Sequence, residues 1–214
     1  MKSQNILCVL LCLVMPSASV AGLFGYEETE KSNLSMFTQW LSVLERQIKE
    51  RVPVGHCAGR ELDQCHVKNW MNYLKSIRHL PRREQLARVN SFANQQNYIL
   101  DFDNYGVDDY WATPGEFLSN HGDCEDYAII KMMSLKLLGF DMHQTRLVVV
   151  QDTNLRQAHA VLAVSVKVSA AMGRQQDTLI MDNQIDEVVS HRYIFHYVPV
   201  YALNERQWWM FLPH

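Results

Sequence analysis

The segment GDCED, residues 122–126, opens the most clearly helical stretch of the chain. Apolar residues recur at helical spacing over residues 128–137, and Gly139 follows where a helix commonly ends. This spacing predicts a helix that begins near Asp123, with Cys124 in its first turn. The unpaired N–H groups and the dipole of a helix start favour an anion, and a thiolate is such an anion. Cys124 is therefore a candidate nucleophile.

Helical patterns dominate the chain before this segment. Ser32 or Asn33 could cap a first amphipathic helix, and Pro81 could start a third. Residues 101–122 are acidic and punctuated by Gly and Pro, which is typical of a loop. The predicted helices are residues 33–50, residues 62–79 and a third that starts at Pro81.

Strand patterns follow the helix, with β-branched runs and alternating apolar residues. The order of helices first and mainly antiparallel strands afterwards is that of an α+β fold. We expect a catalytic helix packed on a mainly antiparallel sheet, with further helices at the amino-terminal end. The predicted strands are residues 146–151, 158–168, 178–182 and 197–203, with a turn at 173–177.

His159 and Asp182 could complete a hydrolytic centre with Cys124. A cysteine nucleophile needs a base, usually His, and a third group that orients the imidazole. His159 lies near the start of one predicted strand and Asp182 ends the next, so adjacent strands could bring them together. Each residue also has a purely structural explanation, namely a buried Cys, a structural His and a turn-forming Asp. Their order and context favour a Cys-His-Asp hydrolase.

The acids that flank Cys124 compete with this interpretation. Asp123, Glu125 and Asp126 would raise the pKa of a neighbouring thiol. They could simply cap the helix. They could also join the acidic loop at 101–109 in binding a hard cation such as Ca²⁺, whose charge would cancel theirs.

The amino terminus has the pattern of a signal peptide. Lys2 precedes an apolar run at residues 6–15, and small residues at 19–21 predict cleavage after Ala21. An uncleaved anchor is the alternative interpretation. The mature chain would be one domain, residues 22–214, with a mainly helical part at 22–95 and a catalytic part at 96–214.

Cleavage would leave three of the five cysteines, and an exported compartment is usually oxidising. Cys57 and Cys65 could form a local disulfide there, or they could stay reduced and pack. The net charge of −3 over 214 residues argues against nucleic acid as the main partner.

Two longer motifs, DDYWATPGE at 108–116 and GDCEDYA at 122–128, resemble the bacterial transglutaminase-like cysteine proteinases. Shorter matches extend the resemblance from about residue 35 to residue 205. It implies a papain-like fold of the transglutaminase type. It also implies the following residue roles: Cys124 as nucleophile, His159 as base, Asp182 as orienting acid, Asp123 and Glu125 as Ca²⁺ ligands, and Asp103 and Asp108 as further ligands.

The resemblance further implies a periplasmic, calcium-dependent endopeptidase. Such enzymes cleave the N-terminal region of a large surface adhesin at a di-alanine site, which releases the adhesin and promotes biofilm dispersal. An inner-membrane receptor that senses cyclic di-GMP would sequester the enzyme. Two alternatives stay open, namely a transglutaminase or amidase that uses the same triad, and a non-catalytic homologue that binds a receptor. Trp111 could line the site or belong to the core.

Overall fold

The computed structural model describes residues 22–50, 62–170 and 173–213. The predicted signal peptide and Cys57 lie outside these residues, so the predicted cleavage and the Cys57–Cys65 pair stay predictions. Within the described ranges, no helix is long and apolar enough to cross a membrane.

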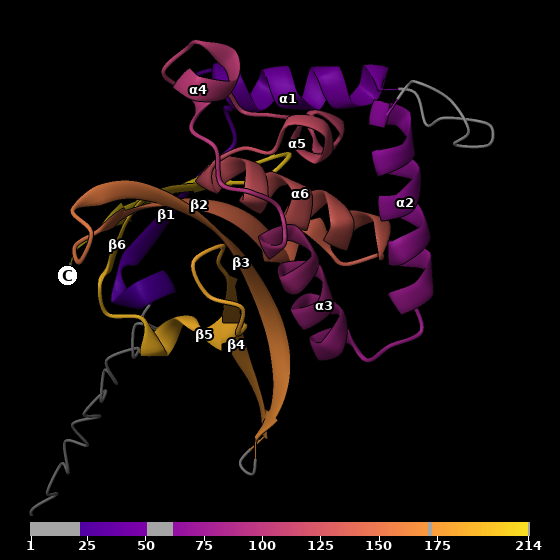
Figure 1. The fold of residues 1–214 in the computed structure, drawn as a ribbon. Helices are drawn as coiled ribbons and strands as arrows, with labels where there is room; N and C mark the ends of the chain where they lie inside the picture. Colours follow the sequence, from indigo (N-terminus) through magenta and orange to yellow (C-terminus); the bar gives the residue numbers. More distant parts are fainter. Residues whose placement is uncertain (1–21, 51–61, 171–172, 214) are drawn as a thin grey trace, which may run out of the picture.

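The described part of the chain is built around one seven-stranded sheet with the order β1-β7-β6-β2-β3-β4-β5. Every pair of neighbouring strands is antiparallel. The longest strands curve strongly beneath the helices (Figure 1). The strands are β1 Glu27–Lys31, β2 Thr145–Asp152, β3 Gln157–Ala170, β4 Gly173–Met181, β5 Val189–Ser190, β6 Tyr197–Leu203 and β7 Trp208–Leu212.

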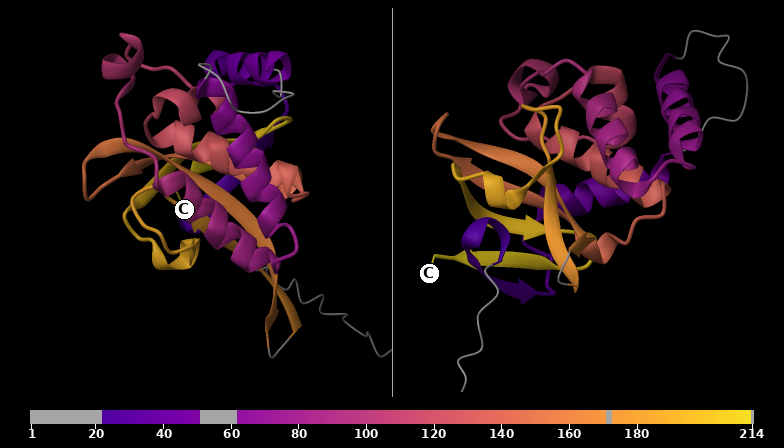
Figure 2. Two further views of the ribbon diagram at one scale, coloured as in Figure 1. Left: turned by 45° about the vertical axis from the view of Figure 1, so that its right-hand side comes forward. Right: turned by 90° about the horizontal axis from the view of Figure 1, so that it is seen from below.

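The helices gather on one face of this sheet, and the two rotated views agree on that arrangement (Figure 2). One helix, α6, packs directly on β2 and β3, while α3 and α5 pack against α6. The α+β architecture predicted from the sequence is therefore confirmed. The helices are α1 Thr38–Lys49, α2 Leu62–Ile77, α3 Arg82–Asn94, α4 Asp101–Tyr105, α5 Pro114–Asn120 and α6 Cys124–Leu137, with the short 3-10 helices η1 Leu23–Gly25, η2 Met142–Gln144 and η3 His191–Tyr193.

The central helix α6 begins and ends where the sequence predicts. A capping box between Asp123 and Asp126 starts the helix, and Gly139 follows its end with a φ of 81°. Nearly all of its side chains are buried, because the sheet covers one side and α3 and α5 cover others. The first turn of α6 is thereby held rigidly against the sheet.

Alternation along β3 divides the apolar residues between two clusters. Leu162 and Val164 join the large core beneath the helices. Val161 and Ala163 point to the other face, where they pack with Leu23 of η1. Strands with apolar residues on both faces are expected for a sheet that is covered on both sides.

The acidic region 101–122 was predicted as a loop, and this prediction is wrong because the region contains α4 and α5. Helix α5 starts with a capping box in which Thr113 accepts a hydrogen bond from the N–H of Glu116, with Pro114 at the first helical position. These are helix-start signals. They outweigh the Gly and Pro content that suggested a loop.

Two further details differ from the prediction. Residues 173–177 belong to β4 rather than to a turn. Helix α1 starts at Thr38 instead of residue 33, because Asn33 forms a local turn in which its side chain accepts a hydrogen bond from Ser35 N–H at 2.9 Å. Strands β1 and β7, which were not predicted, pair with each other at one edge of the sheet.

Trp40 ties α1 to the sheet, and its removal is expected to destabilise the whole fold. The indole is fully buried, and its Nε1 donates a hydrogen bond to Asn204 O at 3.0 Å. Trp40→Ala should lower the free energy of unfolding by about 3–5 kcal/mol. Ile48, on the same helix, is 85% exposed, so Ile48→Ala is a matched control that should change it by only about 0.5 kcal/mol. Urea unfolding would measure both, and equal losses would contradict the placement of α1.

Candidate active site and metal centre

Cys124 is the first residue of α6, and its side chain is half-buried. Its thiol donates a hydrogen bond to Glu125 Oε2 at 3.2 Å. The backbone N–H of Ala160 in β3 also interacts with the sulfur and favours its ionised form. The sulfur therefore lies beside the residue that follows His159 in the chain.

His159 and Asp182 meet on the adjacent antiparallel strands β3 and β4. His159 Nε2 lies 2.9 Å from Asp182 Oδ1, and both side chains are buried. Because Asp182 engages Nε2, Nδ1 is the ring nitrogen that can serve Cys124. The strand order thus brings the two predicted residues into direct contact.

Asp182 is held by more than His159. Its Oδ2 accepts a hydrogen bond from Tyr197 OH at 2.6 Å, and its Oδ1 accepts one from Gln184 N–H at 2.9 Å. Burial raises the pKa of Asp182, but the hydrogen bonds and the charge of His159 outweigh it, so the net pKa is lowered. Asp182 is therefore a buried, ionised carboxylate. Tyr197 was not predicted as a site residue, because nothing in the sequence distinguishes it from the other aromatic residues of the strands.

Five carboxylates gather at the start of α6, and two of them, Asp123 and Glu125, form one group with the Cys124 sulfur. Hydrogen bonds fix their positions: Asp126 accepts from Ala112 N–H at 2.6 Å, and Asp101 accepts from Tyr110 N–H. In each possible ligand group the ligating atoms lie within 4.8 Å of one another. The groups are Asp101 with Asp109 and Glu125, Asp101 with Asp123 and Asp126, and Asp123 with Cys124 and Glu125.

This concentration of negative charge changes how the acids titrate. Burial and the neighbouring acids raise the pKa of Asp101 to about 6, and they raise the pKa of Asp126 well above its ordinary value. Burial, together with the charges of Glu125 and Asp123, raises the pKa of the Cys124 thiol. The protein alone thus holds the thiol in its less reactive form.

The residues present fit a hard cation. The donors are carboxylate oxygens from two segments, which suits Ca²⁺. Asp101 Oδ1 and Asp123 Oδ1 are buried and accept no hydrogen bond from the described residues. Buried acceptors without a donor are rare and costly, and a bound cation would satisfy them.

The predicted ligands only partly coincide with this cluster. Asp123 and Glu125 belong to it. Asp103 and Asp108 are exposed and are not among its members, while Asp101 and Asp109 from the same acidic loop are. Trp111 is 6% exposed and belongs to the core. Its Nε1 donates to Asp109 Oδ1 at 3.1 Å, so the indole helps to position a cluster carboxylate.

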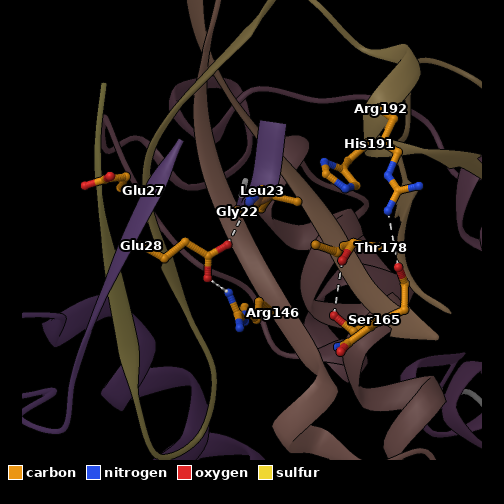
Figure 3. Close-up of a pocket in the computed structure, with 11 residues that line it drawn as sticks. Gly22, Leu23, Glu27, Glu28, Arg146, Ser165, Thr178, His191 and Arg192 are labelled. Carbon is orange, nitrogen blue, oxygen red and sulfur yellow. Dashed lines mark hydrogen bonds and ion pairs between the residues drawn. The ribbon is translucent and has the colours of Figure 1, made fainter. Parts of the chain in front are cut away.

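A separate cavity of about 460 Å³ lies on the other face of the sheet (Figure 3). Glu28 accepts a hydrogen bond from Leu23 N–H and forms an ion pair with Arg146 there. The Ser165 and Thr178 hydroxyls share a hydrogen bond across neighbouring strands. Neither Cys124 nor the acidic cluster lines this cavity, so it is distinct from the candidate site.

Comparison with known families gives a direct assignment. The sequence model of the bacterial transglutaminase-like cysteine proteinases matches residues 48–214. The chain belongs to this family. The chain is therefore a transglutaminase-like cysteine protease. A search of curated protein sequences finds no match.

Solved structures of a transglutaminase-like proteinase resemble this chain. Legionella pneumophila LapG is 29% identical, with a TM-score of 0.59, and the match covers 79% of this chain and 86% of that one. A calcium-bound structure of LapG matches with the same values. An EGTA-treated structure matches with the same identity and TM-score and is covered over 84% of its length. LapG thus has the same fold.

Proposed function

We propose that this protein is a periplasmic, calcium-dependent cysteine endopeptidase with Cys124 as nucleophile, His159 as general base and Asp182 as orienting acid. The observation that carries the proposal is the buried hydrogen bond between His159 and Asp182, next to a helix-start cysteine. Membership in a cysteine proteinase family adds independent support.

The chemistry is acyl transfer in two steps. The Cys124 thiolate attacks the scissile carbonyl, and the imidazolium of His159 gives its proton to the leaving amine. His159 then takes a proton from water, and the resulting hydroxide hydrolyses the thioester to release the acid and regenerate the thiolate. Asp182 holds the imidazole in one orientation and stabilises its charged form. The backbone N–H of Cys124 can stabilise the oxyanion.

The carboxylate cluster supplies the calcium dependence. Asp101, Asp109, Asp123, Glu125 and Asp126 would hold Ca²⁺ through oxygen atoms. The charge of the bound ion offsets that of the acids. With that charge offset, the thiol of Cys124 loses the repulsion that raises its pKa. The calcium-bound and EGTA-treated structures of LapG support this part of the proposal.

The proposed substrate is the N-terminal region of a large surface adhesin, cleaved at a di-alanine site. Its release would promote biofilm dispersal. An inner-membrane cyclic di-GMP receptor of the LapD type would sequester the enzyme. The similarity to LapG supports this part of the proposal, and the signal-peptide pattern of residues 1–21 supports the periplasmic location.

The substrate proposal can be tested with a purified adhesin fragment that contains the di-alanine site. We expect cleavage in calcium at that site. A fragment in which both alanines are replaced by glutamates is the matched substrate control and should stay intact. Cleavage of both fragments at the same rate would contradict the assigned specificity.

A transglutaminase or amidase is the second candidate, because the fold is of the transglutaminase type and an acyl-enzyme can be intercepted by an amine. Incorporation of a labelled primary amine into a glutamine peptide would support it. Peptide hydrolysis without incorporation would dismiss it. A non-catalytic homologue would be favoured if a thiol-reactive probe labelled Cys124 no faster than the denatured chain.

Asp182→Asn is expected to reduce kcat strongly without unfolding the protein. The amide oxygen can still accept a hydrogen bond from His159, but the negative charge that stabilises the imidazolium is lost, so kcat should fall by roughly 10²-fold. Asp141→Asn is the matched control, because Asp141 is exposed and Asn caps a helix equally well. Steady-state kinetics on the adhesin fragment would compare the two. A loss below tenfold for Asp182→Asn would contradict its assigned role.

A further inference from the structure

Lys131 is a buried lysine that the proposed mechanism does not use. It lies seven residues after Cys124 in α6, so both residues occupy the same face of the helix. Its relative exposure is 1%, and its Nζ makes no hydrogen bond to a described residue. A buried ammonium in that state is costly, and an apolar residue of similar size would avoid the cost. We therefore looked for groups near Lys131 that a buried amine could serve.

The charged groups that face Lys131 come from the loop that follows β4. Burial lowers the pKa of Lys131 to about 7, while the charges of Asp182 and Asp186 act in the opposite direction. On its own helix, the ring of Tyr127 lies 5.8 Å from Nζ. The opposite charges that act on the buried Lys131 amine therefore come from the segment that carries the proposed orienting acid.

The same loop is held from α3 by two asparagines. Asn94 Nδ2 donates to Asp182 O at 3.0 Å and to Asp186 Oδ1 at 3.1 Å. Asn90 Nδ2 donates to the backbone oxygens of Ile185 and Asp186 at 3.1 Å and 3.0 Å. Helix α3 also packs against α6, which carries Lys131. Loop 182–186 is thus fixed to α3, which in turn packs on the helix of Lys131.

Several buried polar groups around this loop have no hydrogen-bond partner among the described residues. Asn90, Asn94 and Asn183 each have a buried Oδ1 that accepts no hydrogen bond from the described residues. Lys131 offers three N–H donors without a protein acceptor. Buried polar groups of this kind are usually joined by ordered water, which makes about three hydrogen bonds. Each of these buried groups can be satisfied by ordered water.

We propose that Lys131 is a positioning residue for the catalytic centre, which it serves by anchoring loop 182–186 through its charge. The anchored loop holds the Asp182 carboxylate against His159 Nε2. This inference rests on the proposed function for its kinetic consequences. Its structural consequence, an ordered His159–Asp182 hydrogen bond, is independent of any substrate.

Lys131→Met tests the inference, because Met keeps much of the volume and removes the charge. We expect kcat on the adhesin fragment to fall by about 10–100-fold, as for other residues that support a site from behind it, while KM changes by less than about twofold. The Tm should stay level or rise, because an apolar side chain replaces a buried unpaired charge. Lys136→Met is the matched control, since Lys136 lies exposed on the same helix and should leave kcat unchanged.

A second readout uses no substrate. The imidazole N–H proton of His159 that is shared with Asp182 should give a downfield NMR signal in the wild type and in Lys136→Met, and it should be broadened or lost in Lys131→Met. If the signal and kcat are both unchanged in Lys131→Met, the inference is overturned. If no variant or wild type cleaves peptide, the proposed function fails, while the NMR comparison still decides whether Lys131 anchors the loop.

Discussion

Cys124→Ala is expected to abolish peptide hydrolysis. The sulfur is the only protein atom in the proposed mechanism that forms a covalent bond with the substrate carbonyl carbon. Its removal should therefore lower kcat by at least about 10⁴-fold, as for nucleophiles in comparable triads. Cleavage of the adhesin fragment, followed by gel electrophoresis with calcium in excess, measures this loss.

The fold should survive this substitution, which makes the result interpretable. Alanine is a good helix former at the start of α6, and the carboxylates on either side of residue 124 are unchanged. The Tm of Cys124→Ala should therefore rise on calcium addition as that of the wild type does. Residual hydrolysis within tenfold of the wild-type rate, in a variant with that calcium response, would show that another group is the nucleophile.

Removal of calcium is expected to have the second largest effect. Without a cation, five clustered acids and the half-buried thiol share one region, and the pKa of Cys124 is raised. A chelator should abolish activity and lower the Tm, and added Ca²⁺ should restore both. At a free calcium concentration 100 times the Kd, the ion contributes about 2.7 kcal/mol to the free energy of unfolding. Mg²⁺ should restore little, because it requires a tighter octahedral shell.

Two substitutions in α4 test which of its carboxylates binds the calcium ion. Asp101→Asn removes the charge of a buried carboxylate that two of the ligand groups share, so calcium affinity should fall at least about tenfold. Asp103→Asn changes an exposed carboxylate on the same short helix and should leave affinity unchanged. Isothermal titration with Ca²⁺ measures both. A larger loss for Asp103→Asn would place the ion with the ligands first predicted from the sequence.

Much of the centre of the fold could be predicted from the sequence, because its elements have strong local patterns. Helix α6 has a capping box, continuous helical spacing and a terminal glycine. Strands β2, β3 and β6 have alternating or β-branched apolar residues. Strand β1, with the sequence EETEK, has no such pattern, since it is a mostly exposed edge strand whose pairing with β7 depends on distant residues.

The carboxylate cluster at the start of α6 could be predicted from the sequence only in part. The acidic loop contains several aspartates, and only the path of the backbone decides which of them point inward. Residues two positions apart on a helix lie on different faces, so α4 buries Asp101 and exposes Asp103. Asp109 joins the cluster because the indole of Trp111 holds it. Neither the burial of Asp101 nor the contact between Asp109 and Trp111 can be inferred from composition.

The most direct test of the account is intact-mass spectrometry of the enzyme during turnover of a short di-alanine peptide in calcium. We predict a transient adduct on Cys124 whose added mass equals that of the N-terminal product less one water, as expected for a thioester. The adduct should be absent when His159 is replaced by Ala, because His159 also protonates the leaving amine, and it should be absent when calcium is chelated. Turnover without an adduct on Cys124, or an adduct on another residue, would contradict the assignment of Cys124 as the nucleophile.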